Sequence, residues 1–250
     1  PGRAPEPVEA NLDDLGRLVR AADADVGIAH DGDADRAIFF DENGEYIEGD
    51  ASLAALAAEA LEPGDATVAA VNVSQRLVDV CDDVGADLEL TPIGATNIIT
   101  RIQELQAEDR RVPIAGEGNG GIFFPDFRLV RDGAFIGAKF LELLATTGES
   151  ASAVVEPYTA YENVRRNLRY DEESELSAML GAAEQYAADA DVEASTVDGY
   201  RLDYGDAWVL VRPSGTEPKV RIYAEARDAD RAANLADAVE GELRAALEAA

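Results

Sequence analysis

The chain has 250 residues, 47% of them apolar, and its 51 acidic against 21 basic side chains give a formal net charge of −30. So acidic a chain lacks the basic surface that nucleic acids require, so we expect no nucleic-acid partner. No apolar run approaches the ~18 residues of a membrane span and no secretory signal pattern opens the chain, so we expect a cytoplasmic protein without membrane contact. The acidic residues are spread along the chain, which is typical of salt-adapted proteins and suggests a haloarchaeal source.

The first part of the chain predicts a helix, then short strands on either side of an acidic loop. We expect the helix at 12–22 and the strands at 25–29, 37–40 and 46–47. Asn11 is a suitable cap for the helix, and Asn43-Gly44 is a strong hairpin signal between the last two strands. The prolines of residues 1–7 predict extended chain before the helix.

From residue 50 the chain alternates between helical and strand patterns. We expect helices at 51–61, 74–84, 95–106 and 133–146, and strands at 67–71, 87–90 and 112–115. Strands that alternate with helices of this length imply βαβ units and a mostly parallel sheet. Cys81 falls within an expected helix, where a small buried residue is the default.

The last part changes character. We expect strands at 156–169, 196–202, 207–211 and 220–226, and helices at 172–189 and 229–249. Runs of strands closed by a helix indicate a separate α+β domain. The fold class is therefore α/β, with mixed, mostly parallel sheets flanked by helices and a C-terminal α+β domain. We place the domains at 1–45, 46–155 and 156–250.

The loop Asp31-Gly-Asp-Ala-Asp-Arg36 is the most informative motif. Three carboxylates at alternate positions, Asp31, Asp33 and Asp35, need a counter-charge wherever water is scarce. A hard divalent cation bound by oxygen ligands supplies one, and Mg²⁺ is favoured where a phosphate completes the coordination shell. Arg36 adds a fixed positive charge suited to a phosphate. The loop therefore predicts a place where a cation and an anionic substrate meet.

Two other interpretations of this loop compete. A solvated acidic loop is plausible in so acidic a chain. An EF-hand would use Asp31, Asp33, Asp35 and Glu42 at its loop positions 1, 3, 5 and 12. Arg36 nevertheless stands where an EF-hand needs glycine, and the flanking segments are strand-like, so the EF-hand is disfavoured.

Two further loops carry groups suited to sugars and phosphates. Gly116-Glu-Gly-Asn-Gly-Gly121 follows an apolar strand, and its Glu117 and Asn119 suit sugar hydroxyls, although a plain turn would explain it equally well. In Arg212-Pro-Ser-Gly-Thr-Glu-Pro218, one guanidinium, two hydroxyls and a glycine-containing backbone could converge on a phosphate. A hairpin turn with a surface arginine is the alternative for this second loop.

The three loops, in this order and at this spacing, resemble those of the α-D-phosphohexomutase superfamily, which includes phosphomannomutases, phosphoglucomutases and phosphoglucosamine mutases. The resemblance implies Mg²⁺ on Asp31, Asp33 and Asp35, with Arg36 contacting the transferring phosphoryl group or orienting a phosphoserine. It implies sugar binding by the Gly-Glu loop and by Thr91-Pro-Ile-Gly94. The residues so implicated are Glu117, Asn119, Thr91 and Gly94 for the sugar, and Arg212, Ser214, Gly215 and Thr216 for the phosphate that is not transferred.

The chain also departs from the family pattern. Gly121 stands where several relatives have histidine, and the sole histidine, His30, is expected to have a structural role. The Ser-His-Asn type motif that carries the transferred phosphate in relatives does not occur in the 250 residues.

We therefore expect the C-terminal portion of a Mg²⁺-dependent phosphohexomutase that is inactive without its N-terminal domains. Its partners would be a mannose, glucose or glucosamine phosphate, the bisphosphate intermediate and the missing domains. A non-catalytic sugar-phosphate-binding module and a calcium-binding protein are the alternatives.

Overall fold

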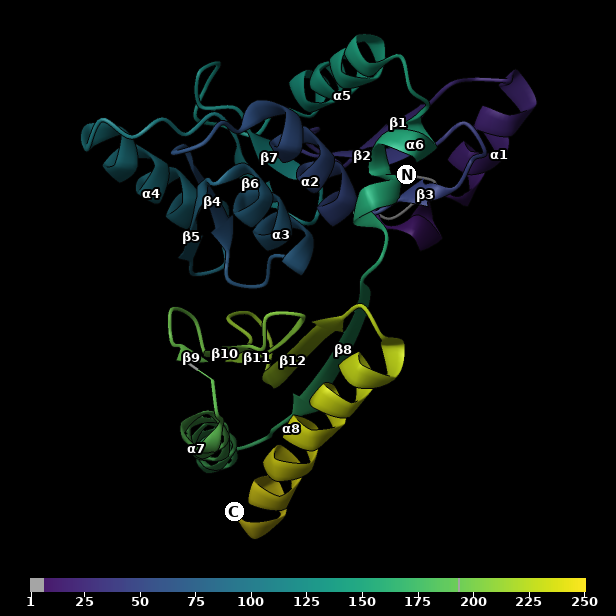
Figure 1. Ribbon diagram of the computed structural model, residues 1–250. Helices are drawn as coiled ribbons and strands as arrows, with labels where there is room; N and C mark the ends of the chain where they lie inside the picture. The colour runs from purple at the N-terminus through teal and green to yellow at the C-terminus, as the bar shows by residue number, and fades with distance from the viewer. Residues whose placement is uncertain (1–6, 193) are drawn as a thin grey trace. The chain divides into compact units, whose positions relative to one another are not determined.

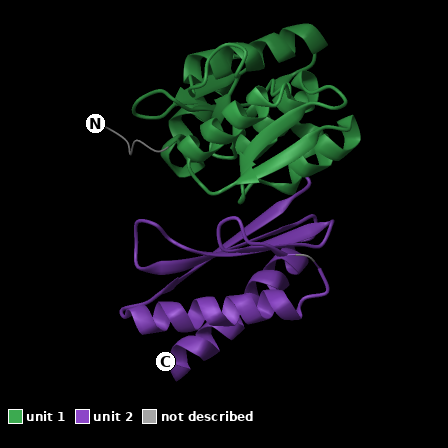
Figure 2. Cartoon of the chain, turned by 90° about the vertical axis from the view of Figure 1, so that its left-hand side faces the viewer, with its two compact units in different colours: residues 1–159 green, residues 160–250 purple. Residues whose placement is uncertain are grey.

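The computed structural model describes residues 7–192 and 194–250 (Figure 1). It divides into two compact units, residues 1–159 and residues 160–250, and each is described by itself below (Figure 2). The extended chain predicted at 1–7 lies, but for its last residue, outside the described residues. The predicted division at 1–45, 46–155 and 156–250 stays a prediction.

A small antiparallel sheet in the order β1-β2-β3 opens the first unit. Its elements are the 3-10 turn η1 (Glu9–Asn11), the helix α1 (Asp13–Ala22) and the strands β1 (Gly27–His30), β2 (Ala37–Phe40) and β3 (Tyr46–Ile47). The predicted Asn-Gly turn is present, with Gly44 at φ 71°. The prediction that Asn11 caps the first helix is wrong, because Asn11 belongs to η1 and Leu12 precedes α1 without a side-chain cap.

A four-stranded mixed sheet in the order β5-β4-β6-β7 forms the rest of this unit with its helices. The elements are α2 (Gly49–Ala60), β4 (Ala66–Ala70), α3 (Gln75–Val84), β5 (Asp87–Thr91), α4 (Ala95–Ala107), β6 (Ala115–Glu117), β7 (Gly121–Phe123), α5 (Gly133–Thr147), α6 (Ala151–Val155) and η2 (Glu156–Tyr158). Strand β4 runs parallel to both β5 and β6, whereas β7 is antiparallel to β6. The predicted α/β class is confirmed.

The strand predicted at 112–115 is misplaced. Residues Val112 and Ile114 are buried, but the strand β6 begins only at Ala115. Pro113 explains the shift, because proline has no N–H to donate to a sheet ladder. Strand β6 ends at Glu117 and β7 begins at Gly121, so residues 118–120 of the glycine-rich loop form the turn of the β6–β7 hairpin.

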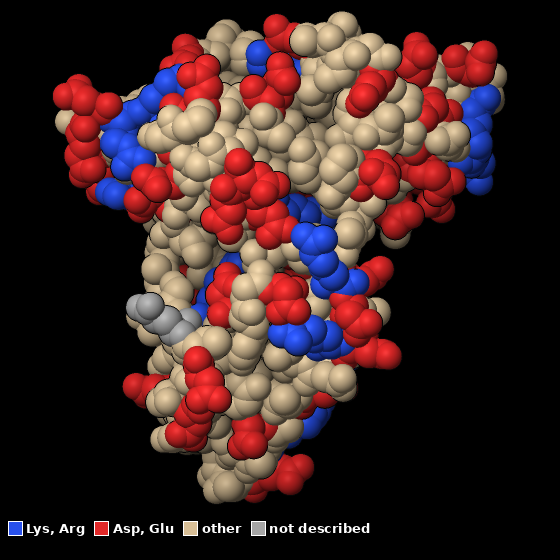
Figure 3. All heavy atoms as spheres, viewed as in Figure 1, with Lys and Arg blue, Asp and Glu red and all other residues tan. Residues whose placement is uncertain are grey.

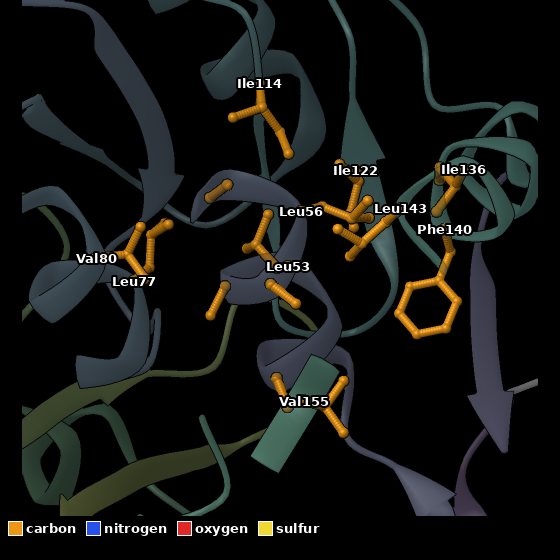
Figure 4. Close-up of a cluster of buried hydrophobic side chains, with 14 of the residues drawn as sticks. Leu53, Leu56, Leu77, Val80, Ile114, Ile122, Ile136, Phe140, Leu143 and Val155 are labelled. Atoms are coloured by element: carbon orange, nitrogen blue, oxygen red, sulfur yellow. The ribbon is translucent and has the colours of Figure 1, made fainter. Parts of the chain in front are cut away.

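The core of this unit surrounds α2, which is apolar and buried over most of its circumference. Figure 4 shows Leu53 and Leu56 of this helix among side chains from neighbouring elements, including Ile114 and Ile122. Cys81 is buried as predicted, and burial, together with the nearby Asp82 and Asp87 carboxylates, raises the pKa of its thiol to about 12.

The second unit is a five-stranded antiparallel sheet in the order β8-β12-β11-β10-β9. Its elements are β8 (Glu162–Arg169), α7 (Glu173–Asp189), β9 (Ala194–Ser195), β10 (Tyr200–Asp203), β11 (Ala207–Pro213), β12 (Lys219–Ala226) and α8 (Ala229–Ala249). Helices α7 and α8 pack together on one face of this sheet (Figure 1). The predicted α+β character is confirmed, although 156–158 is the 3-10 turn η2 with Pro157 in its first turn, and 196–199 is not strand.

Acidic side chains are spread over the face drawn in Figure 3, with basic side chains between them. Within the described residues, no helix is both long enough and apolar enough to cross a membrane.

Candidate functional site

The hairpin loop between β1 and β2 brings the three predicted aspartates together. One oxygen from each of Asp31, Asp33 and Asp35 lies within 4.8 Å of the others. Strand pairing ends with His30 opposite Ala37, and Ala34 takes the left-handed conformation, with φ 57°, that turns the chain between them. Three converging carboxylate oxygens form a donor set that fits a hard cation such as Mg²⁺.

Arginine contacts offset part of the charge of this loop. The Arg36 backbone N–H and side-chain Nε donate to the two oxygens of Asp31 at 3.2 and 2.5 Å. Burial acts to raise the pKa of Asp31, but the hydrogen bonds from Arg36 outweigh it and hold that pKa below its usual value. Burial raises the pKa of Asp35 above its usual value, against the opposing charge of Arg131.

The start of helix α5 holds the backbone of the aspartate loop. The Gly133 N–H donates to the Ala34 carbonyl at 2.9 Å, and His30 Nδ1 lies 2.9 Å from the Arg36 carbonyl oxygen. A Cβ at Gly133 would lie 2.6 Å from both that oxygen and His30 Nδ1, so the close approach requires glycine. His30 thus supports the loop backbone, in line with the structural role expected of it.

The β6–β7 turn places Glu117 beside the same loop. Asn119 Oδ1 accepts a hydrogen bond from the Gly121 N–H at 3.0 Å, which closes the turn. The Gly120 carbonyl accepts from the Ala37 N–H at 3.1 Å, at the first residue of β2. The turn is therefore bonded to the strand that leaves the aspartate loop, and Glu117, with 11% of its side chain exposed, lies at this junction.

Arg131 connects the two loops through their side chains. Its Nη1 donates to Glu117 at 2.7 Å, and its Nη2 donates to Asp35. Sequence reasoning missed this residue, because its two partners lie 14 and 96 positions away and no local pattern joins them.

Thr91 and Gly94 lie at the same edge of the sheet as Glu117. Thr91 ends β5 and Glu117 ends β6, and both strands run parallel to β4, so their carboxyl ends share one edge. The buried Thr91 hydroxyl is 3.1 Å from the Pro92 carbonyl oxygen and 3.4 Å from that of Ala69, so it is engaged with backbone. Gly94 has φ 130° at the start of α4, a conformation that favours glycine.

The predicted phosphate loop is the turn between β11 and β12 in the second unit. Arg212 pairs with Asp198 at 3.0 Å, and Ser214 Oγ is 3.4 Å from the Thr216 nitrogen, within donating distance. Gly215 has no atom within 4 Å of where its Cβ would lie, so the loop is open at that point.

Arg221 is a second arginine at this loop that sequence reasoning missed. It stands directly opposite Arg212 in the β11–β12 register and donates to Ser214 Oγ at 3.2 Å. The Nε atoms of both arginines are buried and have no hydrogen-bond partner among the described residues. The hairpin register could have revealed Arg221, because residues that flank a turn at matching distances face each other.

Comparisons with known proteins agree with this architecture. Three models of the phosphoglucomutase/phosphomannomutase family match the chain: alpha/beta/alpha domain II at residues 1–44, alpha/beta/alpha domain III at 48–161 and the C-terminal domain at 167–242. The chain therefore belongs to the phosphoglucomutase/phosphomannomutase family.

Curated relatives and solved structures are similar to the chain along nearly all of its length. A "Phosphoglucomutase/phosphomannomutase" of Thermococcus kodakarensis is 37% identical over 93% of the chain and 50% of the relative. A "Probable phosphoglucosamine mutase" of Methanopyrus kandleri is 38% identical over 95% of the chain and 52% of the relative. A crystal structure of a phosphoglucomutase/phosphomannomutase family protein from Burkholderia thailandensis is 28% identical, with a TM-score of 0.80 over 98% of the chain and 51% of that structure. The chain thus spans about half the length of the relatives it matches.

Proposed function

We propose that this chain forms the cation- and sugar-phosphate-binding part of a Mg²⁺-dependent phosphohexomutase. The enzyme would interconvert hexose 1-phosphates and hexose 6-phosphates through a phosphoserine that lies outside the 250 residues. The observation that supports this most directly is the meeting of the three-aspartate loop and Glu117 within one compact unit. A solvated acidic loop would not need an arginine that joins its Asp35 to Glu117 of a second loop.

Asp31, Asp33 and Asp35 would hold the Mg²⁺ ion, since their oxygens already converge. When bound, Mg²⁺ would neutralise charge on the phosphoryl group being transferred. Arg36 keeps its Nε on Asp31, and its terminal amino groups are the donors that would contact phosphoryl oxygens or orient the phosphoserine.

Glu117 and Asn119 would bind the hydroxyls of the sugar. The Asn119 oxygen is engaged with the Gly121 N–H, so the amide nitrogen of Asn119 is the group offered to a hydroxyl. Gly94 would let backbone approach the sugar closely, with Thr91 fixing the segment before it through its bonds to carbonyls.

The loop of the second unit would bind the phosphate that is not transferred. Arg212, Ser214, Gly215 and Thr216 form the predicted cradle, and Arg221 adds a second guanidinium to it. Two guanidinium groups whose buried Nε atoms have no partner within residues 7–192 and 194–250 are a strong donor set for a phosphate dianion.

Binding and turnover together test the proposal. Calorimetry should detect binding of Mn²⁺ and of at least one of glucosamine, mannose and glucose 6-phosphate. The names of the archaeal relatives make glucosamine 6-phosphate the first to measure. The chain alone, given glucose 1-phosphate, glucose 1,6-bisphosphate and Mg²⁺, should show no turnover.

Three results would contradict the proposal. Turnover that survives further purification would require a nucleophile among these residues. Tight Ca²⁺ binding without any affinity for sugar phosphates would favour a calcium-binding protein instead. Sugar-phosphate binding without any effect of adding a relative's N-terminal domains would favour a non-catalytic binding module.

A further inference from the structure

Arg131 lies between the aspartate loop (residues 31–36) and the sugar loop (residues 116–121), and it donates to one carboxylate in each. Its two terminal nitrogens address different partners, Nη1 on Glu117 at 2.7 Å and Nη2 on Asp35. The exposed fractions of the three side chains are 19% for Arg131, 26% for Asp35 and 11% for Glu117. The guanidinium is therefore shielded from bulk water but remains at the edge of the site.

The chain is built to admit this side chain. A Cβ at Gly121 would lie 2.7 Å from Arg131 Cδ and 3.0 Å from its Nη1, so the absence of a side chain at 121 leaves the space that Arg131 fills. The residues after Arg131 are anchored as well, because Asp132 caps α5 through the Phe135 N–H and Gly133 donates to Ala34. Backbone and side chain thus both fix Arg131 against the two loops.

Stability alone explains this arrangement poorly. For partly buried ion pairs the cost of removing charges from water offsets much of their attraction, so they are weak evidence of a stabilising role. A planar guanidinium does, however, fix the relative positions of two carboxylates better than a lysine can, because its donors point in set directions.

We propose that Arg131 is a positioning residue that couples the aspartate loop to the sugar loop. The proposal rests on the proposed function, since it assigns the cation to Asp35 and the sugar to Glu117. Both carboxylates share one guanidinium, so a change at either one alters the charge available to the other. Loss of the Glu117 charge leaves Arg131 wholly to Asp35, where it competes with a bound cation.

A double-mutant cycle on Mn²⁺ affinity, read by electron paramagnetic resonance, tests this coupling. Glu117→Gln should weaken Mn²⁺ binding about fivefold when Arg131 is present and less than about twofold in the Arg131→Gln background. A merely structural role for Arg131 would leave the effect of Glu117→Gln the same in both backgrounds.

Calorimetry with glucose 6-phosphate, glucosamine 6-phosphate and mannose 6-phosphate tests the sugar side. Arg131→Lys keeps the positive charge but loses the two-pronged geometry, so affinity for the sugar phosphates that bind should fall about tenfold. Gly121→Ala should have a similar effect, because the new methyl group displaces Arg131. Arg128→Lys is the matched control, since Arg128 is a nearby arginine that pairs with Asp132 at 3.4 Å. This variant should change neither the Mn²⁺ affinity nor the sugar-phosphate affinity.

The outcomes separate this inference from the function it rests on. A wild-type chain that binds neither Mn²⁺ nor any of the three sugar phosphates overturns the proposed function, and the inference with it. A wild-type chain that binds Mn²⁺ and a sugar phosphate, with equal effects of Glu117→Gln in both backgrounds and no loss in Arg131→Lys, overturns the inference alone.

Discussion

The loop at 31–36 and the loop at 212–218 carry opposite charges. The first is rich in carboxylates that arginines partly neutralise, and the second is rich in arginines that carboxylates partly neutralise. In the first loop three aspartates converge, and two of them form ion pairs with arginines, Asp31 with Arg36 and Asp35 with Arg131. In the second loop two arginines, Arg212 and Arg221, lie opposite each other across a hairpin, and Asp198 forms an ion pair with Arg212. Each loop carries a partly neutralised excess of one sign.

The charged groups that remain without an ion-pair or hydrogen-bond partner among the described residues indicate what each loop can bind. Asp33 is exposed and adds its oxygen to the aspartate cluster, which suits a cation. The Nε atoms of Arg212 and Arg221 are buried without partners in the part of the chain that the structure describes, which suits an anion. Arg212 and Arg221 are direct partners in the β11–β12 register, and like charges in such positions are destabilising, so an anionic ligand between them would offset their repulsion.

The largest effect that we expect is the response of the whole chain to salt. Carboxylate repulsion acts over a Debye length of ~30 Å at ~0.01 M salt and ~3 Å at ~1 M. The melting temperature should therefore fall by on the order of 10 °C as KCl is reduced from ~2 M to ~0.01 M. Circular dichroism during heating measures this.

Salt should have opposite effects on the stability of the fold and on ligand affinity at the loop 212–218. Over the range in which stability rises, affinity for a hexose phosphate should fall, because ions screen its attraction to Arg212 and Arg221. A sorbitol series of matched osmolality is the control. A melting temperature that does not change with KCl would contradict the proposed salt adaptation.

The next effect is the loss of phosphate binding on Arg212→Ala. Removal of one charge-assisted donor should weaken hexose-phosphate binding by ~1.5–3 kcal/mol and leave the weak binding of the free hexose nearly unchanged. Isothermal titration with the sugar and its phosphate measures both.

A matched control for Arg212→Ala comes from the same sheet. Arg166 pairs with Asp237 at 3.4 Å and Glu240 at 3.5 Å, away from the loop, so Arg166→Ala should not alter phosphate binding. Equal losses for the phosphorylated and the free sugar would break the comparison between the two loops.

Elements with strong local signals could be predicted from the sequence, and contacts between distant segments could not. The strand at 37–40 and the helix at 229–249 are observed as predicted, because apolar patterning and an N-terminal aspartate cap determine them locally. The three candidate loops were also recognisable, since each motif is continuous in sequence. Arg131 was missed because Asp35 lies 96 positions before it. The strand β9 was missed as well, because two residues are too short to show a period.

The smallest effect concerns Glu42, a carboxylate that is compensated without an arginine. Glu42 accepts hydrogen bonds from the Ser152 N–H, at 3.1 Å, and from the Ser152 hydroxyl, in the first turn of α6. Burial acts to raise the pKa of Glu42, but these hydrogen bonds lower it from its ordinary 4.5 to about 2. The charged form is thus favoured by folding, so its contribution to stability is complete above pH 4.5 and is lost as the pH falls towards 2.

Glu42→Gln should lower the free energy of unfolding by about 1 kcal/mol at pH 7, the difference between a hydrogen bond to a charged group and one to a neutral group after solvent exchange. Glutamine keeps the size and one acceptor oxygen of Glu42, so the loss reports the charge. Urea unfolding of the variant and the wild type at pH 7, 5 and 3 should show the difference shrinking between the last two values, because below pH 4.5 the unfolded chain takes up a proton at Glu42 that the folded chain does not. Glu149→Gln, at an exposed neighbouring position, controls for the general loss of one acidic charge. A difference that stays constant with pH would mean that Ser152 binds Glu42 no better when it is ionised than when it is protonated.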